Sequence, residues 1–145
     1  MILIMIVITD SNILFSALKS PNGMVAKILT HKSNIQFYAP DYLIDEIKRH
    51  AGKISDNKKE VLKRLEILLE GIEIINVEDI PKENVLQAIE IVRDIDIDDA
   101  FFVALYLFKK HKIWTSDKVL IKGLEEKGYK ICVTTNELKS NLYKK

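Results

Sequence analysis

Cysteine, glycine and proline are scarce in this sequence of 145 residues. Cys132 is the only cysteine, which excludes an internal disulfide framework and a zinc site built on a cysteine cluster. The 5 glycines and 3 prolines are too few for a collagen-like or low-complexity chain, and 48% hydrophobic residues are too many for a disordered one. A chain of this length and composition is expected to fold as one domain spanning residues 1–145.

An excess of charge is also absent, because 22 Lys and Arg balance 21 Asp and Glu to give a net charge of +1. The net charge therefore gives no indication of a polyanion partner, and any contact with a nucleic acid must come from local basic patches. No stretch approaches the roughly 20 apolar residues that span a bilayer, and residues 1–9 lack the basic region and cleavage site of a signal peptide. The sequence predicts a soluble, cytoplasmic protein without a membrane partner.

Strand-like apolar runs alternate with amphipathic helical segments along the chain. Residues 1–9 form an uninterrupted apolar run, as expected for a strand that is covered on both faces. Further strands are expected at 35–38, 72–77, 113–115 and 131–134, and helices at 11–18, 24–29, 40–52, 58–69, 81–92, 100–108, 117–127 and from 136 onward. This order predicts an α/β fold of three layers, a twisted parallel β-sheet flanked by helices on both faces.

Two carboxylates follow predicted strands and should emerge at the same edge of the sheet, where such folds bind ligands. Asp10 and Asp117 are these residues, Asp99 precedes the most apolar helix, and Glu46 lies beside an apolar helical stripe. If the four converge in a poorly hydrated pocket, their repulsion requires a compensating cation. An all-oxygen cluster selects Mg²⁺ or Mn²⁺, which activates a water for attack on a phosphodiester.

Each acid also has a purely structural interpretation. Asp10 and Asp117 stand where helix N-caps are expected, although capping and metal ligation are compatible. Asp96 and Asp99 have capping-box-like spacing, and of the two Asp96 is favoured as the cap and Asp99 as the catalytic residue. Glu46 is placed to pair with a basic residue three positions later on a solvated helix face.

Four short segments together resemble the PIN-domain ribonucleases, a family that includes the toxins of many toxin–antitoxin pairs. The resemblance extends over nearly the whole chain, and its segments are IVITDSNIL at 6–14, LIDEI at 43–47, DIDDAFFVAL at 96–105 and WTSD at 114–117. It implies a twisted parallel sheet flanked by helices, in agreement with the pattern of elements. It also implies metal-assisted hydrolysis of RNA to a 5′-phosphate and a 3′-hydroxyl, a homodimer, and an antitoxin protein as partner.

The resemblance also assigns roles to individual residues. It implies that one or two Mg²⁺ or Mn²⁺ ions are held by an acidic quartet formed by Asp10, Glu46, Asp99 and Asp117. Asp96 is a candidate fifth ligand, and Asn12 and Thr115 are the polar supports. Ser11 departs from the family pattern, in which Thr is common, but keeps a hydroxyl group.

Two other functions are compatible with the same residues. The first is a non-catalytic PIN-like module that binds RNA or a protein, with the acids retained for stability or a structural ion. The second is a small phosphohydrolase with an aspartyl nucleophile, which ranks last because Asn12 stands where such an enzyme needs a second acid. Basic clusters at 48–53, 58–64 and 109–112 are candidates for an RNA path, with solvated helix faces as the default interpretation.

Overall fold

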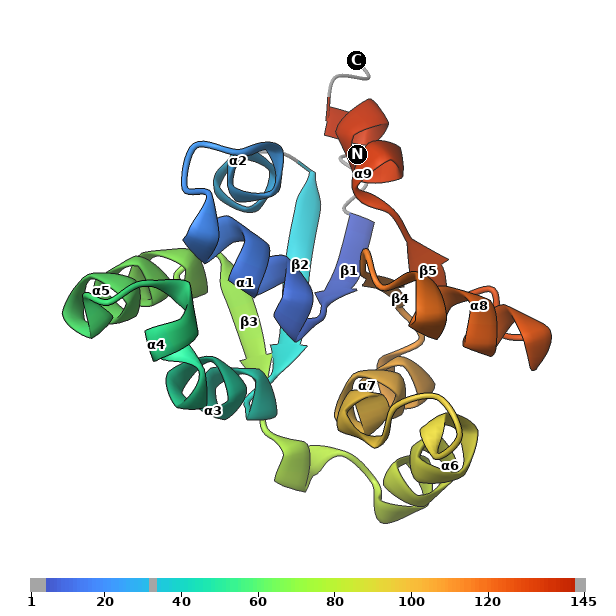
Figure 1. Cartoon of the computed structure of the whole chain (residues 1–145). Helices are drawn as coiled ribbons and strands as arrows, with labels where there is room; N and C mark the ends of the chain where they lie inside the picture. Colours follow the sequence, from blue (N-terminus) through green and yellow to red (C-terminus); the bar gives the residue numbers. More distant parts are fainter. Residues whose placement is uncertain (1–4, 32–33, 143–145) are drawn as a thin grey trace.

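The computed structural model describes residues 5–31 and 34–142 as a parallel sheet surrounded by helices (Figure 1). The strands are β1 (Met5–Thr9), β2 (Ile35–Pro40), β3 (Ile72–Ile75), β4 (Lys112–Trp114) and β5 (Cys132–Val133). The α-helices are α1 (Ser11–Lys19), α2 (Met24–Thr30), α3 (Tyr42–Arg49), α4 (Ala51–Ile54), α5 (Lys58–Leu69), α6 (Lys82–Val92), α7 (Ala100–Lys109), α8 (Lys118–Glu126) and α9 (Thr135–Leu142). Two short 3₁₀ helices are η1 (Val77–Asp79) and η2 (Ile97–Asp99). Residues 1–4 of the first predicted strand lie outside the described residues.

The five strands are all parallel and run in the order β3-β2-β1-β4-β5. The chain moves outward from β1 in one direction and then returns to add β4 on its other side. The order therefore reverses between β1 and β4, and open α/β sheets bind ligands at such a switch point, beyond the carboxyl ends of the strands. Thr9 of β1 pairs with Trp114 of β4, so the residues that follow these two strands emerge together.

Helices cover the sheet in two groups, which confirms the predicted three-layer α/β fold. Helix α7 packs against β2, β1 and β4, with α6 against it, whereas α1 contacts α2, α3, α4 and α5. In Figure 1 the arrowheads of β2 and β3 point between α3 and α7. The carboxyl edge of the sheet thus lies between elements from both groups.

The core explains why the two most apolar segments fold as they do. Val7 and Ile8 of β1 are completely buried, as a strand covered on both faces requires. Helix α7 buries Phe102, Val103 and Leu105, which confirms the prediction of a central buried helix. Within the described part of the chain, no helix has the length and apolar character needed to cross a membrane.

The prediction was wrong at the segment 40–52. Pro40 is the last residue of β2 instead of a helix residue, and the N–H of Asp41 donates to the Ile75 carbonyl oxygen at 3.0 Å. The single predicted helix is divided into α3 and α4 at His50, whose φ of −109° and ψ of 11° leave the helical region. Both resulting helices, α3 and α4, contact α1.

The predicted strands 72–77 and 131–134 are shorter than expected. The N–H of Val77 donates to the Asp41 carboxylate at 3.0 Å, and a 3₁₀ turn begins there in place of a longer β3. At the other edge, β5 contains only Cys132 and Val133, and α9 follows after Thr134. Apolar runs alone cannot show where such side-chain hydrogen bonds end a strand.

Candidate active site

Asp10 lies directly after β1 and caps α1. Its Oδ1 accepts a hydrogen bond from the Ile13 N–H at 3.0 Å, and the residue is only 2% exposed. Burial raises the pKa of Asp10 to about 6, with smaller contributions in the same direction from Asp117 and Glu46. The Thr115 hydroxyl and the Ile13 N–H lower that pKa in part. Asp10 is therefore a helix cap and also a buried acid whose negative charge is disfavoured by neighbouring carboxylates.

Asp117 follows β4 at the same edge of the sheet, as predicted from the sequence. Its Oδ1 accepts hydrogen bonds from the backbone N–H groups of Val119 at 3.0 Å and Leu120 at 3.2 Å, which caps α8. The Thr115 hydroxyl accepts from the Asp117 N–H at 3.0 Å. Thr115 is completely buried. Its hydroxyl connects Asp10 and Asp117, because it accepts from the Asp117 N–H and also lowers the pKa of Asp10.

Of the two acids in the third segment, Asp96 caps a helix, as the sequence predicted, and Asp99 does not. Asp96 is exposed, and its Oδ1 accepts from the Asp98 N–H at 3.0 Å, which caps η2. Asp99 is half-buried at the start of α7 and makes no side-chain capping hydrogen bond. Burial raises the pKa of Asp99 to about 8, with further increases due to four other acids, in decreasing order Asp96, Asp10, Asp117 and Glu46.

Glu46 reaches the site from α3, and its principal partner is Ser11 rather than Arg49. The Ser11 hydroxyl donates to Oε1 of Glu46 across 35 residues of sequence. Burial raises the pKa of Glu46, and the Ser11 hydrogen bond is the largest effect that lowers it. Sequence reasoning missed this role for Ser11, although the hydroxyl that it shares with the family's usual Thr was the available signal.

Asp117 and Glu46 raise the pKa of both Asp10 and Asp99, but the four acids do not form a closed ligand set. Buried Oδ2 atoms of Asp10 and Asp99 make no regular hydrogen bond to the part of the chain that the structure describes, even though Thr115 is close enough to lower the pKa of Asp10. Buried carboxylate oxygens without donors favour a proton or a cation. Over residues 5–31 and 34–142, no three Asp, Glu, His or Cys side chains are placed to hold one metal ion together.

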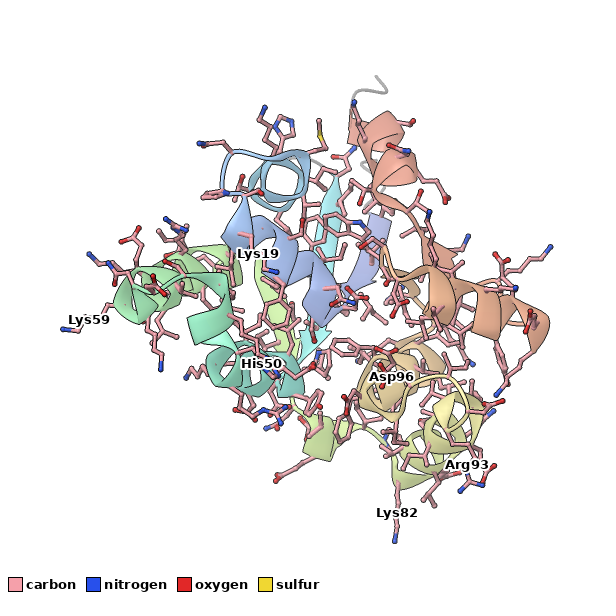
Figure 2. All side chains as sticks on the ribbon, viewed as in Figure 1. Lys19, His50, Lys59, Lys82, Arg93 and Asp96 are labelled. Carbon is pink, nitrogen blue, oxygen red and sulfur yellow. The ribbon has the colours of Figure 1, made fainter. Side chains whose placement is uncertain are left out.

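Among the described residues, Asn12 forms no hydrogen bond with the acids. Asn12 is exposed on α1 and lines a cleft of about 270 Å³ with Phe15, Lys19, His50, Lys53 and Ile54. Asn12 follows Asp10 by two residues and His50 ends the helix that carries Glu46, so the cleft lies next to these two acids in the chain. In Figure 2, His50 and Asp96 are labelled on opposite sides of the strand ends. The sequence prediction included His50 and Lys53 in a basic cluster, but it did not connect them with Lys19.

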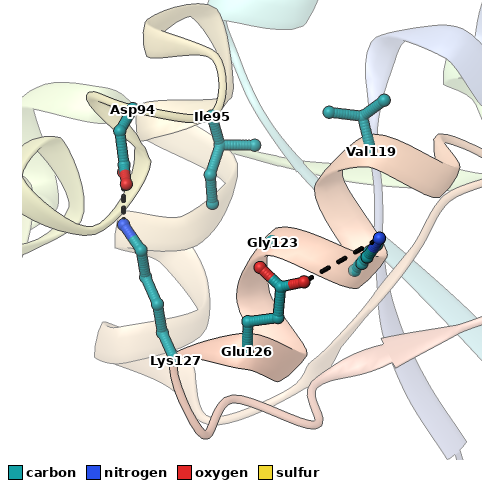
Figure 3. A pocket seen from close by; sticks show the side chains of 7 residues that line it. Asp94, Ile95, Val119, Gly123, Glu126 and Lys127 are labelled. Carbon is teal, nitrogen blue, oxygen red and sulfur yellow. Dashed lines mark hydrogen bonds and ion pairs between the residues drawn. The ribbon is translucent and has the colours of Figure 1, made fainter.

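A second pocket, of about 310 Å³, lies between α8 and the loop after α6 (Figure 3). Here the charges are paired: Lys127 forms an ion pair with Asp94, and Lys122 lies 4.0 Å from Glu126. Hydrogen bonding to Lys127 lowers the pKa of Asp94. Ile95 occupies the space above Gly123, where an added Cβ would lie 2.7 Å from Ile95 Cδ1. This pocket offers no uncompensated charge to a ligand.

Comparisons with known proteins agree with this fold. One similar chain comes from the crystal structure of VapBC2 from Rickettsia felis, which was solved bound to a DNA fragment from the VapBC2 promoter. It has a TM-score of 0.70 at 15% identity, and the match covers 90% of this chain and 98% of that one. A chain from VapBC-1 of nontypeable Haemophilus influenzae has a TM-score of 0.65 at 16% identity, covering 91% and 99%. A chain from a toxin-antitoxin complex of Klebsiella pneumoniae has a TM-score of 0.62 at 19% identity, covering 89% and 97%.

Sequence comparison identifies the family. No curated protein matches the sequence. The family model described as the PIN domain matches residues 8–142, which include all four acids and nearly the whole chain. The chain therefore belongs to the PIN-domain family.

Proposed function

We propose that this protein is a metal-dependent endoribonuclease that hydrolyses RNA phosphodiester bonds. The observation that carries the proposal is that Glu46 and Asp117, from two other parts of the sequence, raise the pKa of the buried Asp10 and of Asp99. Structural acids are ordinarily paired with cations or exposed to water, as Asp94 is. Buried carboxyl groups with raised pKa values at a switch point are typical of a functional site.

The donor chemistry of the site fits Mg²⁺ or Mn²⁺. Asp10, Glu46, Asp99 and Asp117 are the proposed ligands, with Asp96 as a fifth acid beside them. Oxygen ligands of this kind suit hard divalent cations, and the unpartnered Oδ2 atoms of Asp10 and Asp99 are the positions that most need positive charge. When bound there, such a cation would lower the pKa of a water and stabilise negative charge on the phosphoryl group.

The remaining residues position these acids and control their protons. Ser11 holds the Glu46 carboxylate, and Thr115 supports Asp10 through its hydroxyl and Asp117 through the backbone N–H. Asp99 retains a proton at neutral pH when no cation is near, since its pKa is about 8. In-line attack of water on phosphorus, with departure of the 3′ oxygen, leaves a 5′-phosphate and a 3′-hydroxyl.

We further propose that the protein is the toxin of a toxin–antitoxin pair and acts in the cytoplasm. The support is the likeness of its fold to chains from such complexes. A homodimer is also proposed, because Leu86 and Ile97 remain 54% and 52% exposed near an apolar groove that Tyr42 and Phe101 help to line. Exposed apolar surface of this kind favours association.

The test is cleavage of a labelled mixed-sequence RNA by the purified protein in Mn²⁺, in Mg²⁺ or in excess chelator. Asp10→Asn and Asp99→Asn proteins, purified in parallel, reveal any contaminating nuclease. We expect cleavage that requires both the metal and both acids, with 5′-phosphate products. Equal cleavage by wild type and both variants would contradict the proposal.

One observation favours a second candidate, a non-catalytic PIN-like module that binds RNA or a protein. Within the described segments, the acids are not spaced as a ready-made site for a single ion. A module of this kind would bind RNA equally well after loss of the acids and would take up no divalent cation in calorimetry. Metal-dependent cleavage would exclude it.

A further inference from the structure

The cleft beside the acids combines positive charge with exposed ring surface. Asn12, Phe15 and Lys19 recur at helical spacing on one side of α1, and His50 and Lys53 face them from the start of α4. The rings of Phe15 and His50 are 6.1 Å apart, centre to centre. The cleft therefore presents cations and aromatic rings together.

Two hydrogen bonds connect the elements that line the cleft with Glu46 of the acidic site. Ser11, the neighbour of Asn12, donates to Glu46, which ties α1 to α3. The N–H of His50 donates to the Glu46 carbonyl oxygen at 3.2 Å, so His50 follows Glu46 by one helical turn. With a rise of 1.5 Å per residue, the cleft leads about 10 Å from Asn12 to Lys19, away from the acids.

The positive charge of this cleft is not compensated locally. Neither Lys19 nor Lys53 forms an ion pair within residues 5–31 and 34–142, and no acidic residue described there lines the cleft. The pocket beside α8 differs in this respect, because Lys127 and Lys122 have Asp94 and Glu126 as partners. Unpaired lysines next to aromatic rings match the chemistry of a single-stranded nucleic acid, whose phosphates attract cations and whose bases stack on rings.

We propose that the α1–α4 cleft is a nucleotide-binding subsite that positions the RNA strand beside the acids. Lys19 and Lys53 contact backbone phosphate, and Phe15 and His50 contact the neighbouring base. This inference rests on the proposed ribonuclease function. It adds to it the direction in which the strand leaves the site and the residues that hold it there.

The first experiment measures steady-state cleavage of a labelled single-stranded RNA by wild type and a Lys19→Ala/Lys53→Ala variant. We expect KM to rise about tenfold with kcat within about twofold, because the lysines bind substrate without touching the reacting atoms. A Lys82→Ala/Lys130→Ala variant is the matched control, since it removes the same charge from two exposed lysines that do not line the cleft. Lys82 points away from the cleft in Figure 2. RNA affinity is also measured in chelator at several salt concentrations. In the first variant alone, the slope of the logarithm of the binding constant against the logarithm of salt concentration should become shallower by roughly 0.7 for each phosphate that is no longer neutralised.

The base contact is tested separately with RNAs that carry one abasic nucleotide at successive positions from the cleaved bond. We expect one position at which loss of the base weakens binding to wild type but not to Phe15→Leu, a variant that keeps an apolar side chain. His50→Ala should show the same loss of discrimination at that position. Melting curves confirm that each variant is folded.

The outcomes separate the subsite from the function on which it rests. Absence of metal-dependent cleavage by wild type would overturn both. Cleavage with the same KM in wild type, the cleft variant and the control would preserve the nuclease and overturn the subsite, leaving the positive cleft to an acidic protein segment. An equal rise in KM in both double variants would show only general charge attraction and would also overturn it.

Discussion

Asp94 and Asp99 lie five residues apart in one acidic loop, yet their environments are opposite. Asp94 forms an ion pair with Lys127, which lowers the pKa of Asp94. Asp99 is half-buried, and burial together with other carboxylates raises the pKa of Asp99 to about 8. An acidic run is therefore not uniform, because one end forms an ion pair with Lys127 at the end of α8 and the other places a carboxyl group among several other acids.

The largest expected effect comes from neutralising each acid in turn. Asp99→Asn should reduce metal-dependent RNA cleavage by about a thousandfold or more, because it removes a charge that holds the cation. Asp94→Asn should leave the cleavage rate within about twofold. Rate measurements at saturating Mn²⁺ on both folded variants check this, and similar losses in the two would remove the distinction between the ends of the loop.

A smaller loss is expected when a positioning group is removed from the uncompensated side. Ser11→Ala takes away the hydroxyl that donates to Glu46, which should raise the pKa of Glu46 and reduce activity by roughly tenfold to a hundredfold. Ser11→Thr should restore activity, since it keeps the donor. A pH–rate profile of the three proteins tests this, and full activity in Ser11→Ala would exclude a positioning role.

The raised pKa values of Asp10 and Asp99 set the direction in which stability should depend on pH. A group whose pKa rises on folding binds more protons in the folded state, so its stabilisation is complete below the unfolded pKa and is lost as the pH rises through the folded value. For metal-free protein we expect the free energy of unfolding to fall between about pH 4 and pH 8. The change for Asp10, from 3.8 to about 6, corresponds to ~3 kcal/mol at 1.36 kcal/mol per pKa unit.

Denaturant unfolding at several pH values checks this prediction. Between pH 6 and pH 8, the free energy of unfolding should fall less steeply with pH in Asp99→Asn than in wild type. Adding Mn²⁺ at pH 8 should make the wild-type protein more stable again. The lowered pKa of Asp94 acts in the opposite sense, since its stabilisation is lost as the pH falls. A metal-free protein that becomes more stable from pH 6 to pH 8 would contradict the account of Asp99.

The smallest effect is expected on the compensated side. Lys127→Met removes the partner of Asp94 and the hydrogen bond to the Ile91 carbonyl oxygen. The pKa of Asp94 should return toward its ordinary value and the melting temperature should fall slightly, because the ion pair is partly exposed. RNA cleavage should not change. A large loss of cleavage would show that α8 packing and the acidic site are coupled.

Much of the fold could be predicted because its signals are local. The apolar run before Asp10, the alternation of strand and helix patterns, and the apolar α7 segment each follow from the order of residues. The parallel sheet then follows from general connection rules. The division between α3 and α4 at His50 was missed because apolar periodicity continues through it.

The candidate site was predictable only in part. Strand ends indicated Asp10 and Asp117, and Asp96 was correctly expected to cap a helix start. The Ser11–Glu46 hydrogen bond joins residues 35 positions apart, and the cleft that Lys19 and His50 both line brings together residues 31 positions apart. No local pattern reveals either pairing. The charge state of Asp99 likewise depends on burial and on neighbours from several elements.

The most direct test of the central claim, that the acids at the carboxyl edge of the sheet hold a cation, is Mn²⁺ titration by calorimetry at pH 7 in two buffers of different ionisation enthalpy. The comparison gives the number of protons released on binding. We predict binding with release of about one proton in wild type and in Asp94→Asn, because Asp99 must lose its proton to accept the ion. In folded Asp99→Asn, binding should be much weaker and proton release should be lost. No Mn²⁺ binding by wild type, or equal affinity and proton release in all three proteins, would contradict the account.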